Sequence, residues 1–351
     1  MLDVLDAGRL ETSIRQGLQW IESHVADDGE VRPAEGGIAA YYKMLFALSA
    51  GGRVRTANRV ADWVRRTVQT EEGDFAPNRR GRVFSRLYVY PNAWLVYGAH
   101  RLGRLDVSRR GASFLLSFRD EPSGAFHSMR GDALGTEEPG PYVAQSEAQS
   151  PRTAELMCTA MSGLALLYVG YVREAVKAGD FLCRMLASQP RPGRILYTMY
   201  DLQEQRLITD YPMHLSQAFA VDAHELAQYY FQLGIAAAFL SKLYAAVRQD
   251  CYVQAARGYL DFISACREDR FSTPQSGKLA WGSAYLVQLT GEEKYLDVLR
   301  SVTTYLCESQ YPDGHWGEIR EPANLPGVLD LTNEFVSILI ESLSSETVRS
   351  R

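Results

Sequence analysis

Residues 310–316 read Gln-Tyr-Pro-Asp-Gly-His-Trp, and this stretch decides the fold because its pattern returns along the chain. A Gln is followed four positions later by Gly, and two positions further by an aromatic or aliphatic residue. The pattern recurs at 69–75 and 189–195, and looser copies lie at 25–31, 119–126 and 266–271. Self-similarity at a long, uneven spacing is typical of helical repeats. We expect each copy to end a helix, with the Gly in the left-handed conformation.

The residues that precede these turns repeat as well. A basic and a small residue come before an aromatic-aliphatic pair, as in 177–182, 110–115 and, more loosely, 300–306. Together these features resemble the QW repeat of the terpenoid-cyclase and protein-prenyltransferase superfamily, over about residues 10–345. The resemblance implies an all-α fold, a single (α/α)6 barrel that spans residues 1–351 as one domain. In that family the motifs are structural, so they indicate the fold rather than the chemistry.

Apolar spacing between the turns predicts paired helices. We expect an outer set at 11–25, 54–69, 107–119, 170–187, 251–266 and 293–309. A second set is richer in Ala and Gly, which permit close packing, and should form the inner ring. It covers 37–50, 86–103, 152–168, 225–246, 276–290 and 330–344.

The predicted connections differ in length, and this difference indicates which end of the barrel is open. Links from outer to inner helices are long at 120–149, 188–224 and 310–329, whereas the reverse links are short. Long structured loops are usually functional, so we expect the mouth where inner helices begin. Within one of these loops, 194–200 and 206–211 alternate like a β-hairpin that could cover the mouth.

The composition indicates a globular protein without a nucleic-acid partner. The chain is 46% hydrophobic and 23% charged, with a net charge of -5 and a pI near 5.8. No basic stripe is visible, and no apolar run is long enough for a membrane span. The start, Met1-Leu2-Asp3-Val4-Leu5-Asp6, lacks signal-peptide features, which predicts a cytoplasmic location. The five cysteines are expected to be buried thiols rather than a disulfide framework.

The resemblance makes chemical demands that this sequence does not meet. It has no Asp-x-Asp-Asp acid of class II terpene cyclases and no Asp-rich box for a diphosphate-bound metal. The Asp-x-Cys zinc ligands of protein prenyltransferases are absent, as is the Cys-His pair of lanthionine-type toroids. We therefore predict an enzyme without a metal or other cofactor.

The first candidate acid-base cluster is 222–225, Asp-Ala-His-Glu, at the predicted start of the fourth inner helix. In a helix, Asp222 and Glu225 would share a face, and His224 could titrate near neutral pH. The alternative is a capping box, with Asp222 as the cap and Glu225 completing it.

A second candidate pair, Asp330 and Glu334, opens the sixth inner helix. Capping is the simpler role for Asp330, whereas Glu334 lies one turn deeper and is a catalytic candidate.

Aromatic and basic residues gather at the same predicted end. Tyr and Trp rings can orient substrates, stabilise cations and stack on sugars, and Arg or Lys can hold an anion. Packing and surface ion pairs are the alternative roles. The substrate-binding candidates are Tyr41, Tyr42, Arg86, Tyr88, Tyr90, Arg152, Tyr230 and Trp281, with Lys43 nearby.

Three functions fit these observations. The first is a cyclase or isomerase that folds a large hydrophobic terpenoid or polyketide intermediate, with a small-molecule hydrophobic substrate as its partner. The second is a carbohydrate-active hydrolase, lyase or epimerase that works with carboxylates at the mouth. The third is a toroid that binds a ligand without catalysis. Polarity separates the first two, because a sugar pocket needs several converging polar groups whereas a cyclase pocket is mainly apolar.

Overall fold

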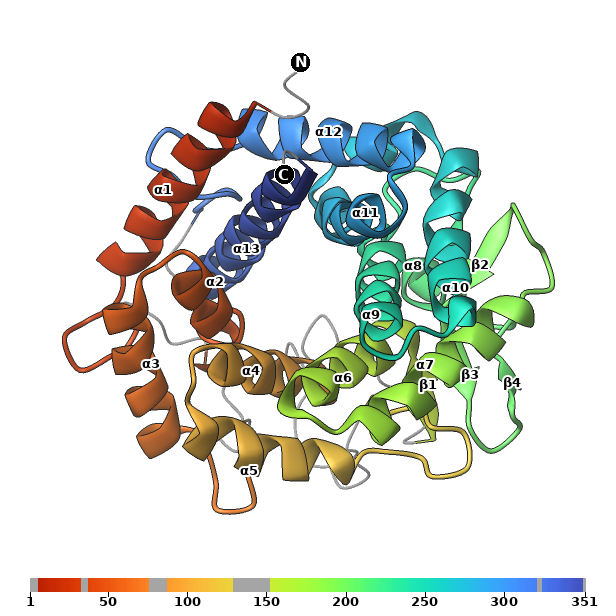
Figure 1. Cartoon of the computed structure of the whole chain (residues 1–351), viewed down its shortest axis with the longest axis horizontal. Helices are drawn as coiled ribbons and strands as arrows, with labels where there is room; N and C mark the ends of the chain where they lie inside the picture. Colours follow the sequence, from red (N-terminus) through yellow and green to blue (C-terminus); the bar gives the residue numbers. More distant parts are fainter. Residues whose placement is uncertain (1–5, 33–36, 76–86, 129–151, 321–323, 350–351) are drawn as a thin grey trace. The chain divides into compact units, whose positions relative to one another are not determined.

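The computed structural model (Figure 1) describes residues 6–32, 37–75, 87–128, 152–320 and 324–349. The chain divides into two compact units. Unit 1 comprises Met1–Phe84, Pro91–Ser117 and Leu306–Arg351, and unit 2 comprises Ser85–Tyr90 and Phe118–Tyr305. Both units are built mainly from helices, and each is described by itself.

Unit 1 packs helices from the two ends of the sequence against each other. The C-terminal helix α13 contacts α1, α2 and the short 3-10 helix η1. The elements of this unit are α1 (Ala7–Ser23), η1 (Gly37–Ala40), α2 (Met44–Ala50), α3 (Val54–Thr67), most of α4 (Val89–Arg101), α5 (Leu105–Leu116) and α13 (Leu325–Arg349).

Unit 2 is centred on α9, which contacts α6, α7, α10 and α11. Its main helices are α6 (Leu156–Val169), α7 (Val172–Ala187), α9 (Phe231–Val247), α10 (Asp250–Asp261), α11 (Gly277–Thr290) and most of α12 (Glu293–Glu308). The helices α6, α9 and α11 are buried almost all round, whereas α7 and α10 bury one face. The two sets therefore match the predicted inner and outer helices.

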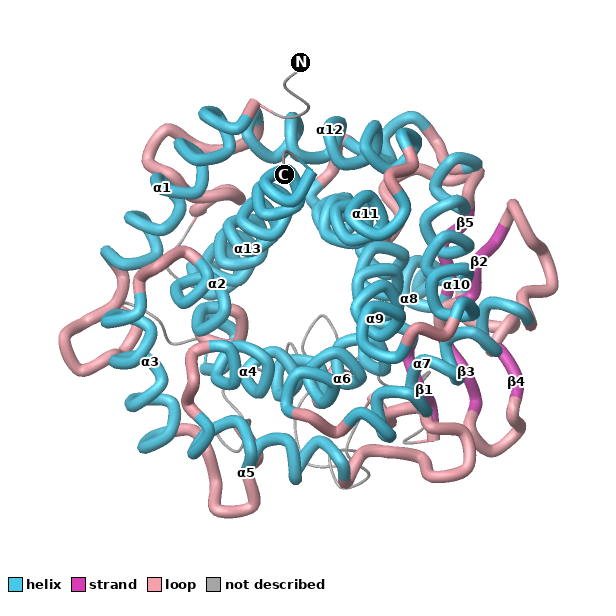
Figure 2. The backbone as a smooth tube through the Cα atoms, viewed as in Figure 1, coloured by secondary structure: helices cyan, strands magenta, loops and turns pink. Residues whose placement is uncertain are grey.

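Two small antiparallel sheets complete unit 2, and Figure 2 shows their strands in magenta. One sheet has the order β1-β3-β4 and the other pairs β2 with β5. The strands are β1 (Thr153–Glu155), β2 (Ile195–Tyr197), β3 (Met199–Asp201), β4 (Arg206–Leu207) and β5 (Ala220–Asp222), and the short helix α8 (Ser216–Phe219) leads into β5.

The predicted hairpin is therefore only half right. Tyr200 pairs with Leu207, as a hairpin requires, but Ile195 pairs with Asp222 in the other sheet. The strand is divided at Thr198, whose N–H donates to the carbonyl of Phe219 and whose carbonyl accepts from Leu156. Those partners lie far away in the sequence, so local alternation could not reveal them.

The repeated turn joins three helices, as the copy at 310–316 shows. Gln310 Nε2 donates to the carbonyl of Ser13 at 3.0 Å and to that of Gly314 at 2.9 Å. Gly314 has φ +108°, and a Cβ there would lie 2.4 Å from the carbonyl oxygen of Gln16. Trp316 is buried, and its indole N–H donates to the carbonyl of Leu306 at 2.7 Å. The turn therefore fixes the end of α12 against α1.

A second feature of the repeat becomes visible only in three dimensions. The backbone N–H of the aromatic residue after the turn donates to a polar side chain on the next inner helix. Trp316 donates to Thr332 Oγ1 at 3.1 Å and Phe75 to Asn92 Oδ1 at 3.0 Å in unit 1; in unit 2, Phe126 donates to Thr159 Oγ1 at 3.2 Å. Buried polar residues of these inner helices thus satisfy backbone donors of the turns.

Each predicted helix range overlaps a helix of the structure, but several ends differ. Helix α1 begins at Ala7 rather than at 11, and α10 ends at Asp261 rather than at 266. Four inner helices also start differently from the prediction. The range 37–50 is broken by a turn at 41–43, and the range 152–168 begins as strand β1. Helix α9 begins at Phe231 rather than at 225, and α13 begins at Leu325 rather than at 330. Residue 86 of the second inner range, 86–103, lies outside the described residues.

Candidate active site

Three charged side chains meet inside unit 1, where the turn before α2 packs against α13. Lys43 Nζ lies 2.8 Å from Asp330 Oδ1 and also donates a hydrogen bond to Glu334 Oε2. Asp330 and Glu334 are four residues apart on α13, so they lie on one face of the helix. Only 4% of the Lys43 side chain is exposed, against 8% of Glu334 and 26% of Asp330. Asp330 is thus the member of this Lys43 cluster that solvent reaches best.

The charges of the Lys43 cluster do not cancel, because one ammonium faces two carboxyl groups. Burial alone would lower the pKa of Lys43, but the carboxylates of Asp330 and Glu334 outweigh it and raise that pKa. Lys43 therefore keeps its proton at neutral pH. Burial raises the pKa of Asp330; Lys43 opposes this shift, whereas the like charge of Glu334 adds to it. Asp330 is consequently a stronger base than an ordinary aspartate.

Tyr42 completes the cluster, whereas Tyr41 does not belong to it. The ammonium of Lys43 lies 4.8 Å from the ring centroid of Tyr42, and the Tyr42 hydroxyl hydrogen-bonds to Asp330. Tyr41 accepts the backbone N–H of Val31 at 2.8 Å and stacks on Trp63 at 4.5 Å. Burial raises the pKa of Tyr41 to about 12. Its contacts are those of a packing residue.

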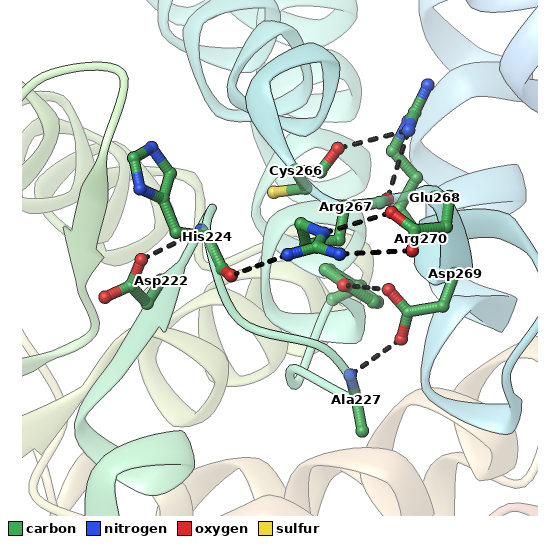
Figure 3. Close-up of polar contacts among 9 residues, drawn as sticks. Asp222, His224, Ala227, Cys266, Arg267, Glu268, Asp269 and Arg270 are labelled. Carbon is green, nitrogen blue, oxygen red and sulfur yellow. Dashed lines mark hydrogen bonds and ion pairs between the residues drawn. The ribbon is translucent and has the colours of Figure 1, made fainter.

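The predicted cluster Asp222, His224 and Glu225 occupies a surface loop of unit 2 that precedes α9, not a helical turn (Figure 3). Asp222 ends strand β5, and its Oδ1 accepts the backbone N–H of His224 at 2.9 Å. Both His224 and Glu225 are exposed. The expectation of a shared helix face or a capping box is wrong, because the strand pairing of β5 and the turn after it delay the helix to Phe231.

Most other predicted binding residues take part in packing or surface contacts. Tyr90 and Trp281 are buried, Tyr88 stacks on Phe118 at 5.9 Å, and Arg152 is exposed and bonded to Gln203. Tyr230 is buried and donates its hydroxyl to Asp269 Oδ1 at 2.8 Å. Arg86 lies outside the described residues.

Sequence reasoning underestimated Lys43 and Asp330. It assigned Asp330 to capping, but α13 begins five residues earlier, so Asp330 lies inside the helix. One signal was present, since Lys43 directly precedes the apolar run Met-Leu-Phe-Ala-Leu at 44–48. A charge at the edge of a buried helix needs a charged partner. Unit 2 also buries charged residues at the starts of inner helices, with Glu155 before α6 and Lys278 in the first turn of α11.

The described part of the chain has no candidate for a membrane-spanning helix or for a metal site. No helix there is long and apolar enough to cross a membrane. Nor does any group of three or more His, Cys, Asp or Glu side chains among those residues have an arrangement that could hold a metal ion.

Comparison with known proteins finds likeness in structure alone. No family model matches the sequence, and no curated protein matches it. A D-mannose isomerase matches with a TM-score of 0.66 and 11% identity, covering 98% of this chain and 99% of that one. A cellobiose 2-epimerase from Bacillus thermoamylovorans matches with a TM-score of 0.63 and 12% identity, covering 93% and 98%. A GH76 α-mannanase from Bacteroides thetaiotaomicron matches with a TM-score of 0.62 and 9% identity, covering 96% and 97%.

These identities establish the fold and no more. The neighbours are α/α toroid enzymes that act on carbohydrates, and no terpenoid cyclase is among the structures compared above. The sequence-based prediction of an all-α toroid is confirmed, and the chain has the α/α toroid fold.

Proposed function

We propose that this protein is a carbohydrate-active enzyme, and specifically an isomerase that moves a proton between adjacent carbons of a neutral sugar. Support comes from the fold, which the chain shares with a D-mannose isomerase, a cellobiose 2-epimerase and an α-mannanase. The observation that carries the proposal is the Lys43 cluster, in which a partly exposed carboxyl group of raised pKa is held by a buried ammonium.

The cluster supports a sugar substrate better than a terpenoid or polyketide. Charged groups in a dry pocket are costly unless polar partners surround them. Sugar hydroxyls supply such partners, whereas a hydrocarbon intermediate would strip water from Asp330 and return no hydrogen bond. Buried charges also lie at the starts of α6 and α11, so unit 2 too has charged groups in its interior, which a mainly apolar cyclase pocket would not need.

Asp330 is the proton-transfer group in this mechanism. Its carboxylate takes the proton from the carbon next to the sugar carbonyl, and the electron pair of the broken C–H bond forms the enediolate. The hydroxyl proton of the adjacent carbon moves to the former carbonyl oxygen. The same carboxyl group then gives its proton to the former carbonyl carbon on the same face, and the oxygen that lost its proton forms the new carbonyl. A base with a pKa raised toward the working pH suits this step. Lys43 and Glu334 are positioning residues that hold Asp330 and set its pKa.

The arrangement of the two carboxyl groups distinguishes isomerisation from hydrolysis. Glycosidases place their two carboxyl groups on either side of the scissile bond. Asp330 and Glu334 instead lie on one face of α13 and share the ammonium of Lys43, so they approach a substrate from the same side. One acid-base group on one face is sufficient for a transfer between adjacent carbons.

Solvent exchange tests the proposal without knowledge of the product. Neutral aldoses and ketoses, beginning with D-mannose, are incubated with the enzyme in deuterium oxide and followed by proton NMR. We expect deuterium to enter the carbon next to the carbonyl with the wild type, and the rate to fall by ~100-fold or more in Asp330→Asn. Release of reducing ends from glycosides without any exchange would instead show a hydrolase.

A further inference from the structure

The loop before α9 in unit 2 is exposed, yet its backbone is held at many points (Figure 3). Asp269 accepts two hydrogen bonds from it, one from the N–H of Ala227 at 2.6 Å and one from the hydroxyl of Tyr230 at 2.8 Å. Two further side chains hold the same loop: Gln228 Oε1 accepts the N–H of Asp222 at 3.0 Å, and Arg267 reaches the carbonyl of His224 at 3.5 Å. The loop is therefore preorganised rather than loose.

One residue of this loop has an unfavourable backbone conformation. Ala227 has φ +55°, a left-handed conformation that is unfavourable for residues with a Cβ. The two bonds to Asp269 compensate, since hydrogen bonds to a charged acceptor are about twice as strong as neutral ones. Strain of this kind persists where the surroundings fix the backbone, and it often accompanies binding.

The loop presents side chains of two kinds to solvent. His224 and Glu225 are exposed, the imidazole points away from the Arg267 guanidinium (Figure 3), and 49% of Leu226 is accessible. Further along the same segment, Tyr229 and Phe231 stack at 5.2 Å, and both are only partly buried. The ammonium of Lys278 lies 5.2 Å from the ring centroid of Phe231. Hydrogen-bonding groups thus lie beside an aromatic surface that is partly open to solvent.

We propose that residues 224–231 form a sugar-binding subsite in unit 2, with Asp269 as its positioning residue. The face of Tyr229 that is turned away from Phe231 contacts the C–H face of a sugar ring, while His224 and Glu225 hydrogen-bond its hydroxyl groups. Asp269 acts through the backbone of Ala227 and the hydroxyl of Tyr230. The class of ligand rests on the proposed function, but the site uses residues outside the Lys43 cluster.

Binding and turnover separate this subsite from the proposed isomerase chemistry. Calorimetry with D-mannose and α-1,6-mannotetraose in the Asp330→Asn background measures binding without turnover. We expect Tyr229→Ala and Asp269→Ala to weaken binding by about tenfold, the loss expected for one aromatic contact or its alignment. In the otherwise wild-type enzyme, KM should rise to the same extent while kcat stays within about twofold. Hydrogen exchange of residues 224–230 should accelerate in Asp269→Ala.

Two matched controls complete the experiment. Tyr171 is a partly buried tyrosine at the start of α7, and Asp250 is an exposed aspartate in the first turn of α10. Tyr171→Ala and Asp250→Ala should bind as the parent does. Equal binding by all variants, or no binding of either sugar by the parent, would overturn the subsite. Unchanged solvent exchange in Asp330→Asn would overturn the isomerase proposal instead, whatever Tyr229→Ala does.

Discussion

At the scale of single residues, the proposed proton transfer depends on the buried charges of the Lys43 cluster. Lys43 is held between two carboxyl groups of α13, and Asp330 is the one that solvent reaches. The sequence indicated that Glu334 needed an explanation beyond capping, and the structure provides one in its bond to Lys43. It could not indicate that residue 43 meets residue 334, because that contact depends on how α13 packs against the turn before α2.

Substitutions at Lys43 and Glu334 should reveal positioning rather than direct proton transfer. In Lys43→Met the two carboxyl groups lose their cation, so the pKa of Asp330 should rise further. We expect the pH at which solvent exchange reaches half its maximum to move upward in this variant. Glu334→Gln removes a like charge and should move it downward. A rate that falls equally at every pH in both variants would contradict these roles.

The raised pKa of Asp330 also makes the free energy of unfolding depend on pH. Its protonated form is favoured in the folded state, so this contribution is fully present below the ordinary aspartate pKa of about 3.9. The contribution is lost as the pH rises through the higher folded value. We therefore expect the stability of the wild type relative to Asp330→Asn to decrease as the pH rises above about 4. Urea unfolding at several pH values measures this difference, and an increase over that range would contradict it.

At the scale of elements, the repeated turn could be predicted in type but not in detail. The Gln, Gly and aromatic positions were visible in the sequence, and the helix pairs followed from them. The acceptors on the next inner helix, Thr332, Asn92 and Thr159, were not visible, because each lies at least 16 positions away from the N–H that it receives. The late start of α9 was missed for a similar reason, since the residues of β5 pair with partners 23 to 27 positions earlier.

A pair of glycine substitutions tests the turn. Gly314→Ala should destabilise unit 1 strongly, by roughly 2 kcal/mol or more, because φ is +108° and the new Cβ would meet the carbonyl of Gln16. Gly327 lies in the first turn of α13, where an added Cβ would meet no atom within 4 Å. Gly327→Ala should leave stability unchanged or raise it by up to about 1 kcal/mol. Similar melting temperatures for the two variants would show that the turn tolerates a side chain.

At the scale of the whole molecule, the sequence predicted the fold class correctly, but the comparisons support the carbohydrate alternative better than the cyclase that the resemblance favoured. The QW-like turns fix how the helices pack. Toroid enzymes with different substrates share this packing, so the turns say little about the substrate. The polarity of the inner helices is the more informative feature, because buried charge demands a function or a partner. It was hard to see in the sequence, where each charged residue stands alone among apolar neighbours.

An enzyme whose proton transfer is performed by a carboxyl group should not need an added metal. We expect solvent exchange to proceed at the same rate after dialysis against a chelator, since Asp330, Lys43 and Glu334 together supply the base and its supporting charges. Loss of activity on chelation, with recovery on addition of a divalent cation, would contradict this expectation.

The most direct test of the central claim is a crystal structure of Asp330→Asn soaked with the sugar that shows the fastest solvent exchange. The proposed mechanism requires the carbon next to the carbonyl to lie within about 3–3.5 Å of the residue 330 side chain, on the side of α13 that carries Glu334. A sugar bound with that carbon far from the Lys43 cluster would contradict the proposed active site.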